Sequence, residues 1–406
     1  MAIRRATERR LPIHAAGSGH SFTEAALTEG AMVRLGVLDR FLDADPASGV
    51  VKVEAGITLN ALSEALWERG LALENLGDID RQTLAGAIST ATHGTGARFQ
   101  NLSAQVEAME LVLADGSLLS VSSQSDPDAH LATRVGLGAL GVIYSVTLRT
   151  VPAFVMRRVD SPLPVGETLA SLDELANANE HFEFYVFPYT DTALVIERNR
   201  VEGPPRPRGR VSAYVNEILI ENRAMDLLAR TGRRFPAAIP RLARFASRQF
   251  SRSERTDRSY RVFASERRVR FTEMEYALPR EHGAEAVRRV LALVRERRLP
   301  VGFPIEFRVV ASDDAYLSTA YGRETAYVAV HQYQGAPWRE YFRAVEEIMS
   351  SYGGRPHWGK RHFQTAATLR ELYPRWDDFQ RVRARLDPQG TFANAYTDRV
   401  LGPVGG

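Results

Sequence analysis

The stretch of residues 84–96, LAGAISTATHGTG, constrains this chain more than any other part of its sequence. Almost all of its side chains are small, glycine and threonine recur, and charge is nearly absent. Backbone with so little side-chain bulk can be approached closely by another group, and glycine adopts turn conformations that other residues avoid. The stretch therefore predicts a surface against which a large ligand lies.

A second glycine-rich segment, Gly17-Ser18-Gly19-His20-Ser21, follows an apolar run near the start of the chain. A glycine-rich turn after a strand offers backbone N–H groups to a phosphate. The spacing excludes two common motifs, because Phe22 stands where the dinucleotide fingerprint G-x-G-x-x-G needs its third glycine, and no Gly-Lys-Ser/Thr of a P-loop follows. Two loops of this kind in one domain indicate a cofactor that carries a diphosphate.

Composition excludes several classes of protein. The chain has 406 residues, of which 44% are hydrophobic and 25% charged, as in an ordinary globular protein of two domains. Cysteine is absent, which excludes disulfides, thiolate metal sites and a cysteine nucleophile. No apolar run approaches the roughly 20 residues of a membrane span, and the N-terminal sequence lacks a signal-peptide core, so we expect a cytoplasmic protein. The net charge of +3 gives no reason to expect nucleic acid as a partner.

The basic residues are almost all arginine, because only Lys52 and Lys360 are lysines among 52. A bias toward G+C-rich codons accounts for this excess. A lysine retained in such a background is notable, since lysine can lose its proton near neutral pH and arginine cannot. Arginines concentrate in residues 198–270, which hold 19 arginines and 7 acidic residues. This segment is consistent with a surface that faces nucleic acid or an anionic membrane, but a solvated helical face or an arm folded against an acidic surface accounts for it more simply.

The pattern of apolar residues changes near residue 152 and predicts an α+β fold with two domains. Before this point we expect short strands and glycine turns, including a helix from Leu59 to Arg69 capped by Thr58 and a hairpin around Asp115-Gly116. After it, we expect a loop at 203–210, strands at 268–278, 304–310 and 327–333, and helices at 284–298 and 338–353.

These elements suggest three segments. The first domain spans residues 1–152 and holds both glycine-rich loops. A substrate domain of antiparallel sheet and helices is expected over 153–370, and a C-terminal segment, 371–406, is expected to pack back near the first domain.

Several motifs together resemble one group of flavoproteins. They are GSGHSF (17–22), LGDIDRQTLAGAISTATHGTG (76–96), GALGVIYSVTL (138–148), FTEMEY (271–276), IEFRVVASDDAYLSTAYGR (305–323), RPHWGK (355–360) and NAYTDRV (394–400). In this combination the chain resembles FAD-linked oxidases of the vanillyl-alcohol-oxidase type, and among them the sugar-lactone oxidases and alditol oxidase. The resemblance covers nearly the whole chain and implies a PCMH-type FAD-binding domain followed by the substrate domain.

The resemblance implies FAD as the cofactor, with His20 in the place of a histidine that bonds covalently to the flavin 8α-methyl group. Gly77 matches a position beside flavin C4a where a small residue lets oxygen approach, which favours an oxidase. Asp78 stands where alditol oxidase has a serine, which weakens the alditol interpretation. The residues expected to bind FAD are Gly17, Ser18, Gly19, His20, Ser21, Gly77, Asp78, Thr83, Gly86, Thr90, His93, Gly94, Val142 and Ile143.

The catalytic residues are expected in the second domain. Glu306 and Arg308 are two apart on a strand and therefore share a face, a spacing that alone indicates no more than a salt bridge. The resemblance places this pair in the substrate site, together with His331 and with Lys360, whose counterpart reaches the flavin. We expect His331 or Lys360 to be the base, which for Lys360 requires a lowered pKa. Arg308 would stabilise developing negative charge.

A metal site is not expected. His357 and His362 flank Lys360 at a suitable spacing, but no carboxylate in the neighbouring sequence completes a ligand set.

Members of the resembled family usually carry a longer segment before the G-S-G-H-S motif than the 16 residues found here. Loss of strands there would expose a sheet edge. From the sequence alone, we therefore expect weak FAD binding or a marginal fold.

The implied reaction is the oxidation of D-arabinono- or L-gulono-1,4-lactone, with hydride transfer to flavin N5 and O2 as the acceptor, which gives H2O2. One alternative substrate is an alditol such as xylitol or sorbitol. One alternative acceptor is a cytochrome, quinone or dye, as in a dehydrogenase. A non-catalytic flavin-binding or nucleic-acid-binding protein is the alternative from a different class.

Overall fold

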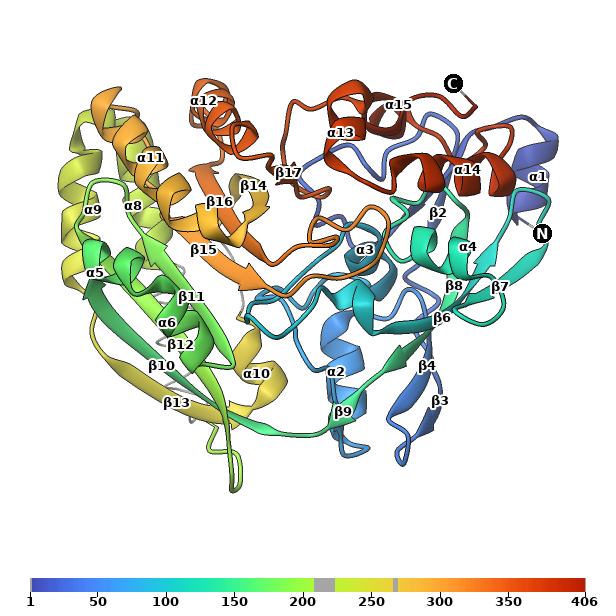
Figure 1. Ribbon diagram of the computed structural model, residues 1–406, viewed down its shortest axis with the longest axis horizontal. Helices are drawn as coiled ribbons and strands as arrows, with labels where there is room; N and C mark the ends of the chain where they lie inside the picture. The colour runs from blue at the N-terminus through green and yellow to red at the C-terminus, as the bar shows by residue number, and fades with distance from the viewer. Residues whose placement is uncertain (1, 208–222, 266–268, 406) are drawn as a thin grey trace.

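Two antiparallel sheets organise the computed structural model, which describes residues 2–207, 223–265 and 269–405 (Figure 1). A five-stranded sheet in the order β3-β4-β8-β6-β7 belongs to the N-terminal part of the chain. An eight-stranded sheet in the order β13-β10-β12-β11-β15-β16-β14-β17 belongs to the part that follows. The expected α+β class is confirmed. In the part of the chain that the structure describes, no helix is long and apolar enough to cross a membrane.

The N-terminal unit is built from short elements. Its sheet contains β3 (Phe41–Asp45), β4 (Val50–Glu54), β6 (Val106–Val112), β7 (Leu118–Ser122) and β8 (Val142–Arg149). Two small sheets pair β1 (Ile13–Ala16) with β2 (Ala31–Arg34) and β5 (Leu71–Ala72) with β9 (Val151–Pro152). The helices are α1 (Ala2–Glu8), α2 (Leu59–Trp67), α3 (Leu84–Ser89), η1 (Leu102–Gln105) and α4 (Pro127–Thr133).

Local sequence signals set the ends of these elements. The Thr58 hydroxyl accepts a hydrogen bond from the backbone N–H of Ala61 (3.2 Å) and caps α2. This helix ends two residues earlier than expected, and Gly70 follows it with a φ of 73°, a conformation that glycine adopts without strain. Gly116 has a φ of 80° in the turn between β6 and β7, which confirms the predicted hairpin.

The second unit consists of long strands and covering helices. Its strands are β10 (Val155–Pro164), β11 (His181–Val186), β12 (Thr192–Val201), β13 (Ser253–Arg258), β14 (Phe271–Pro279), β15 (Ile305–Val310), β16 (Thr325–Tyr333) and β17 (Arg355–Pro356). Its helices are α5 (Val165–Ala170), α6 (Leu172–Ala178), α8 (Met225–Arg234), η3 (Pro236–Ala238), α9 (Ile239–Arg248), α10 (Ser259–Phe263), η4 (Arg280–His282), α11 (Gly283–Glu296) and α12 (Arg339–Ser350). The expected 203–210 loop is described only to residue 207. Residue 268, the first of the expected 268–278 strand, lies outside the described residues, and the strand observed there, β14, begins at Phe271.

The eight-stranded sheet buries its two faces in different ways. Ile305, Phe307 and Val309 of β15 belong to one apolar core with residues of α6, α11 and α12. Because side chains alternate along a strand, Glu306 and Arg308 point to the opposite face, as the sequence predicted. One face of this sheet is therefore a hydrophobic core and the other carries charge.

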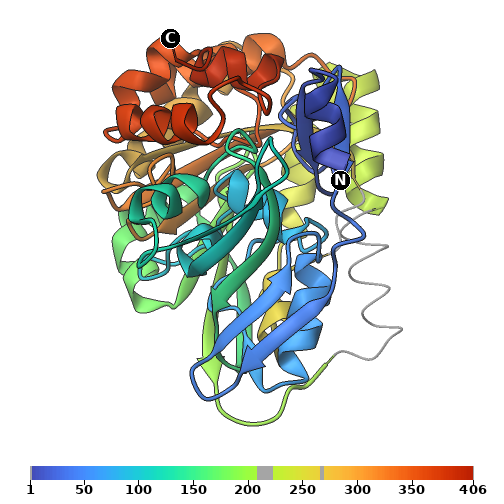
Figure 2. The same ribbon diagram turned by 90° about the vertical axis from the view of Figure 1, so that its right-hand side faces the viewer.

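The C-terminal helices α13 (Ala366–Leu372), α14 (Trp376–Leu386) and α15 (Ala395–Leu401) return to the N-terminal unit. Their apolar side chains join its core, while the β3–β4 hairpin lies at the opposite end of the molecule (Figure 2). Asn394 stabilises the contact between the C-terminal helices and the N-terminal unit. Its Nδ2 donates to the carbonyl oxygens of Ala25 (2.9 Å) and Leu27 (2.8 Å), and its Oδ1 accepts from the N–H of Thr397 (2.8 Å).

We predict that Asn394→Ala lowers the free energy of unfolding by about 2–4 kcal/mol, because it removes a helix cap and two further buried hydrogen bonds. Urea unfolding followed by circular dichroism measures this loss. Thr58→Ala, which removes a single cap bond, is the matched control, with an expected loss of about 1 kcal/mol. Equal losses in the two variants would contradict this account of the C-terminal contact.

Candidate active site

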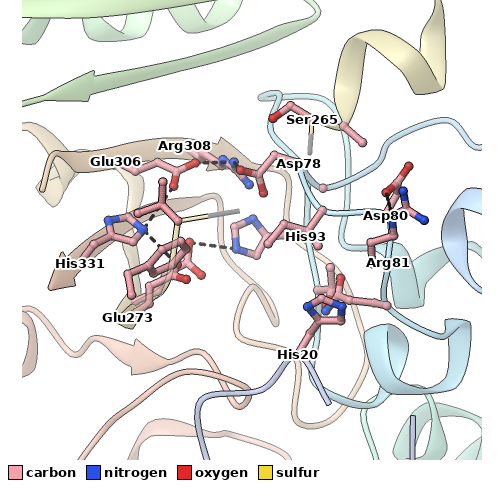
Figure 3. A pocket seen from close by; sticks show the side chains of 18 of the residues that line it. His20, Asp78, Asp80, Arg81, His93, Ser265, Glu273, Glu306, Arg308 and His331 are labelled. Carbon is pink, nitrogen blue, oxygen red and sulfur yellow. Dashed lines mark hydrogen bonds and ion pairs between the residues drawn. The ribbon is translucent and has the colours of Figure 1, made fainter. Parts of the chain in front are cut away.

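A cleft of about 1300 Å³ is lined by residues of both units. Loop residues of the N-terminal unit form one wall, and the charged face of the eight-stranded sheet forms the other (Figure 3). Of the residues expected from the sequence, the following line the cleft: Gly19, His20, Ser21, Gly77, Asp78, Thr90, His93, Glu306, Arg308, His331 and Lys360. The four residues expected to be catalytic, which lie up to 54 positions apart in the sequence, thus share one cavity.

Charged side chains of alternating sign form a line across the polar face of this sheet. In spatial order they are Arg198, Glu183, Arg308, Glu306, His331, Glu273 and Lys360. All but Lys360 belong to five strands, β12, β11, β15, β16 and β14, and all but Lys360 are buried. Each buried carboxylate of this line has a cation on either side, which offsets part of the cost of burying its charge.

Arg308 lies among three carboxylates. Its Nε is 3.0 Å from Glu183 Oε2, its Nη2 is 3.3 Å from Asp78 Oδ2, and it forms an ion pair with Glu306. Glu183 in turn lies 2.7 Å from Arg198 Nη2. Burial opposes the charge of Arg308, but the three carboxylates raise its pKa well above the usual value. Arg308 is therefore a fixed cation facing the cleft.

His331 occupies the centre of the line. Its Nδ1 lies 3.1 Å from the carbonyl oxygen of Pro304, which can only accept, so Nδ1 carries a proton. Its Nε2 lies 3.5 Å from Glu273 and 3.9 Å from Glu306. Although burial disfavours the imidazolium form, these two carboxylates raise the pKa of His331. The geometry thus favours the protonated ring.

Lys360 forms an ion pair with Glu273. Burial opposes its charge, yet Glu273 and Glu275 raise the pKa of Lys360 above its ordinary value. The lowered pKa that a base at this position requires is not found, because the nearest charges are carboxylates rather than cations. Lys360 and His331 are better suited to donate protons than to accept them.

The carboxyl group of Glu306 differs from its neighbours. Burial raises its pKa, Arg308 lowers it, and the negative charges of Asp78 and Glu183 raise it again, with a net upward shift. The Tyr185 hydroxyl donates a hydrogen bond to its Oε1 (2.8 Å). Glu306 is therefore an ionisable group in the cleft whose pKa moves toward neutrality.

His93 pairs with a second carboxylate on the cleft wall. Its Nδ1 lies 2.9 Å from the Gly94 carbonyl oxygen, its Nε2 lies 3.3 Å from Glu275, and its ring stacks on Tyr327 with centroids 3.6 Å apart. The resemblance gave His93 a role beside the flavin. The structure adds that its ring is fixed on three sides.

Two groups of side chains approach the spacing of metal ligands, His93–Glu275–His357 and Glu273–Glu306–His331. In the first, His357 Nδ1 accepts a hydrogen bond from the Gly359 N–H (3.1 Å), so the proton of its neutral ring is on Nε2 and no lone pair is left for a metal. In the second, both carboxylates are already paired with cations. The absence of a metal stays a prediction.

The rim of the cleft suits a dinucleotide. Gly19 and His20 are exposed there, and Gly19 has a φ of 73° with no atom within 4 Å of the position of a Cβ. His20 lines the cleft beside Asp80 and Arg81, and burial together with the charge of Arg81 lowers its pKa, which favours the neutral ring. Glycine, open backbone and a neutral imidazole fit a flavin cofactor at this rim.

Other residues expected to bind FAD do not reach the cleft: Gly17, Ser18, Thr83, Gly86, Gly94, Val142 and Ile143 are absent from its lining. Two of these glycines serve packing within the protein, since a Cβ at Gly17 would collide with Thr83 and one at Gly94 with Asn75. Thr83 caps α3 by accepting from the Gly86 N–H (3.3 Å), and Val142 and Ile143 belong to the core. Their direct contact with FAD stays a prediction.

Sequence reasoning missed Glu183, Tyr185, Arg198, Glu273 and Glu275. A signal was present for four of them, because HFEFYV and FTEMEY alternate polar and apolar residues. The alternation places Glu183 and Tyr185 on one face of their strand, and Glu273 and Glu275 on one face of theirs. Nothing in the sequence indicates which strands are neighbours, and only this adjacency brings Arg198 to Glu183.

The family model for D-arabinono-1,4-lactone oxidase matches residues 146–400, and the model for an FAD binding domain matches residues 1–122. The chain belongs to the D-arabinono-1,4-lactone oxidase family. It is a flavin-dependent oxidoreductase, and its cofactor is FAD. The family model spans the whole eight-stranded sheet with its charged face.

Named relatives cover almost the entire chain. An L-gulono-1,4-lactone dehydrogenase of Mycobacterium tuberculosis is 55% identical, over 99% of this chain and 93% of the relative. L-gulonolactone oxidase of Mus musculus is 33% identical (98% and 91%), and alditol oxidase of a Streptomyces species is 32% identical (95% and 90%).

Solved structures confirm the fold at low identity. Cholesterol oxidase from B. sterolicum superposes with a TM-score of 0.82 at 18% identity, over 99% of this chain and 91% of the other. A solvent-stable cholesterol oxidase gives 0.83 at 19%, over 99% and 92%.

We predict that Glu275→Gln lowers the thermal midpoint at pH 7, because losing a buried hydrogen bond to a charged group costs about 1.5–3 kcal/mol. Burial raises the pKa of Glu275, but His93, Lys360 and His357 lower it more, so the folded pKa lies below the unfolded value of about 4.3. The stabilisation is therefore present above pH 4.3 and is lost as the pH falls through the folded pKa.

Calorimetry from pH 7 to pH 3 tests this expectation. The gap between wild type and variant should narrow below about pH 4.3. Glu285→Gln, on the exposed face of α11, is the control and should show no gap. A gap that is independent of pH would show that Glu275 contributes packing rather than charge.

Proposed function

We propose that this protein oxidises an aldono-1,4-lactone, either L-gulono- or D-arabinono-1,4-lactone, at the carbon that bears a hydroxyl group next to the carbonyl. The line of paired charges through Glu306, Arg308 and His331 at the cleft carries this proposal. A polyhydroxylated, uncharged lactone needs both donors and acceptors, and these residues offer both on one surface. Family membership supports the same substrate class.

When bound, FAD supplies the acceptor for the hydride that leaves the substrate carbon. The protein's part is to bind the lactone, to hold its reacting hydroxyl and to move the proton. Arg308 stabilises negative charge on the substrate oxygen, because its guanidinium stays cationic and is fixed in a site of low polarity. His331 and Lys360 donate hydrogen bonds to substrate oxygens.

The proton acceptor in this proposal is Glu306. An efficient base has a pKa near the working pH, and the pKa of Glu306 is shifted upward by burial and by Asp78 and Glu183. This assignment replaces His331 and Lys360, for which the structure gives raised pKa values.

O2 is the proposed electron acceptor, and H2O2 the proposed product. Gly77 supports this part, since it lines the cleft at the position where the resemblance places oxygen access. An added methyl group there would lie 3.2 Å from the His93 carbonyl oxygen. The alternative is a dehydrogenase with a cytochrome, quinone or dye as its acceptor, and the name of the mycobacterial relative favours it.

Covalent attachment of FAD through His20 belongs to the same proposal. The exposed ring of His20 at the cleft rim and its lowered pKa support it, because a neutral nitrogen is needed to form the bond. Acid precipitation leaves covalently bound flavin in the pellet. Release of all yellow colour to the supernatant would refute this attachment.

Arg308→Ala should lower the limiting rate of anaerobic flavin reduction by L-gulono-1,4-lactone by about 100- to 1000-fold, the usual loss when an oxyanion-stabilising group is removed. Stopped-flow absorbance measures this rate. Arg308→Lys should recover part of it, and Arg288→Ala on the exposed face of α11 should match wild type. A wild-type rate in Arg308→Ala would exclude the assigned role.

A panel of substrates and acceptors resolves the alternatives in the wild-type protein. Under the proposal, lactones reduce the flavin faster than xylitol or sorbitol, and O2 reoxidises it with one H2O2 per lactone. Reoxidation by cytochrome or dye but not by O2 would establish the dehydrogenase instead.

Peripheral membrane contact is proposed for one surface of the second unit, the α8–α9 surface. It consists of the exposed residues Leu227, Arg230, Arg234, Phe235, Arg241, Arg244, Phe245 and Arg248. On α9, Arg241, Arg244, Phe245 and Arg248 follow the spacing of one helical face. Isolated apolar side chains among arginines are typical of helices that lie on anionic lipid. The part of the arginine-rich segment at 208–222 lies outside the described residues.

The triple variant Arg241→Gln/Arg244→Gln/Arg248→Gln should bind phosphatidylserine vesicles about 10- to 100-fold more weakly, since an arginine near such a surface contributes about 1 kcal/mol. Sedimentation with vesicles measures binding of the holoenzyme. Arg370→Gln/Arg381→Gln/Arg385→Gln, on α13 and α14, is the charge-matched control. Wild-type protein that does not sediment with these vesicles would rule out the contact.

A further inference from the structure

Two charged residues, Glu183 and Arg198, lie behind the wall of the cleft. Their side chains are 3% exposed, and neither lines the cavity. They are therefore not placed to touch a substrate. Burying an ion pair costs desolvation that the pair's own attraction scarcely offsets, so its value to stability alone is small.

The strand register brings this pair to Arg308. Glu183 of β11 stands directly opposite Arg308 of β15, and Ile196 of β12 stands opposite Glu183 on the other side. Arg198 is two residues from Ile196 on β12 and shares its face, so it approaches Glu183 diagonally.

Each oxygen of Glu183 has its own cation. Oε1 accepts a hydrogen bond from Arg198 Nη2 at 2.7 Å, and Oε2 lies 3.0 Å from Arg308 Nε. Its neighbouring nitrogen, Nη2, meets Asp78 and Glu306. Arg308 is thus paired through two of its nitrogens, and among the described residues Glu183 is the carboxylate paired with Nε.

We propose that Glu183 is a positioning residue that fixes the guanidinium of Arg308, and that Arg198 acts on Arg308 and Glu306 through Glu183. This inference rests on the proposed function for its kinetic readout, in which Glu306 accepts the substrate proton. Its consequence is that neutralising Glu183 and neutralising Arg198 shift the pKa of Glu306 in opposite directions.

The groups facing Glu306 determine those signs. They are Asp78 from the loop after β5, Glu183 and Tyr185 from β11, Arg308 on its own strand and His331 from β16. Glu183→Gln removes a negative charge, so Arg308 interacts more strongly with Glu306 and the pKa of Glu306 falls. Arg198→Gln removes a cation that compensates Glu183, so the negative charge of Glu183 acts more strongly and the pKa of Glu306 rises.

The experiment compares wild type, Glu183→Gln, Arg198→Gln and the double variant as holoenzymes. The limiting rate of anaerobic flavin reduction is measured against pH, together with the flavin midpoint potential by dye equilibration and the thermal midpoint. Glu197→Gln, next to Arg198 but bonded to Asn179 on the other face, is the control and should match wild type.

In Glu183→Gln we expect a limiting rate roughly 10- to 100-fold lower, as for a displaced catalytic group, and an acid inflection at lower pH. In Arg198→Gln the inflection should move to higher pH. The double variant has no uncompensated buried charge, so it should fold, and its profile should coincide with that of Glu183→Gln. The potential should rise in Glu183→Gln and fall in Arg198→Gln.

Folded Glu183→Gln protein with a rate within two-fold of wild type and an unmoved inflection would overturn the inference. Shifts of the same sign in the two single variants would overturn it as well. If no lactone reduces the wild-type flavin, the proposed function fails. The midpoint potentials need no substrate, so in that case they alone test this inference.

Discussion

A buried carboxylate needs a cation or hydrogen-bond donors beside it, and on the polar face of the eight-stranded sheet cations meet this requirement. Glu183, Glu306 and Glu273 each lie between two positive side chains. Removing any member leaves a neighbour without compensation in a region of low polarity, where an unpaired charge is costly. The site is therefore one electrostatic unit, and the pKa of each group depends on all the others.

The two faces of this sheet have different roles. The apolar face packs on helices such as α6, α11 and α12 and supplies the rigidity that holds charged groups at fixed distances. The N-terminal unit contributes a wall of small residues, some of which exist for its own packing: Gly94 gives room to Asn75, and Gly17 to Thr83. Small side chains in the 84–96 stretch thus serve packing of the protein interior.

Much of the fold could be predicted from the sequence, because its signals are local. The cap at Thr58, the turn at Gly116 and the alternation in IEFRV depend on a few neighbouring residues. Which side chain is suited to act as the base could not be predicted from such local signals. Whether Lys360 has a raised or a lowered pKa depends on Glu273 and Glu275 across the sheet, and strand order is not readable from one sequence.

The same limit explains the residues that sequence reasoning missed, and it applies to motif matches as well. Nothing in the sequence distinguishes Arg198 from the other arginines, because its contact with Glu183 depends on β12 lying beside β11. Val142 and Ile143 match a flavoprotein motif, yet their side chains fill the core of the unit rather than its cleft. A motif identifies the family that a segment belongs to, whereas the burial of each side chain depends on the packing of the whole chain.

The return of the C-terminal helices to the N-terminal core has a consequence for protein engineering. The Phe22 N–H donates to the Gly359 carbonyl oxygen (2.8 Å), and the Tyr396 hydroxyl donates to that of Trp358 (2.7 Å). The loop after β1, the segment of Lys360 and α15 are thus joined in space. A chimera of two members of this family with one crossover near residue 152 would separate Phe22 from Gly359, whereas a double crossover that takes residues 1–152 and 355–406 from one parent would keep both contacts.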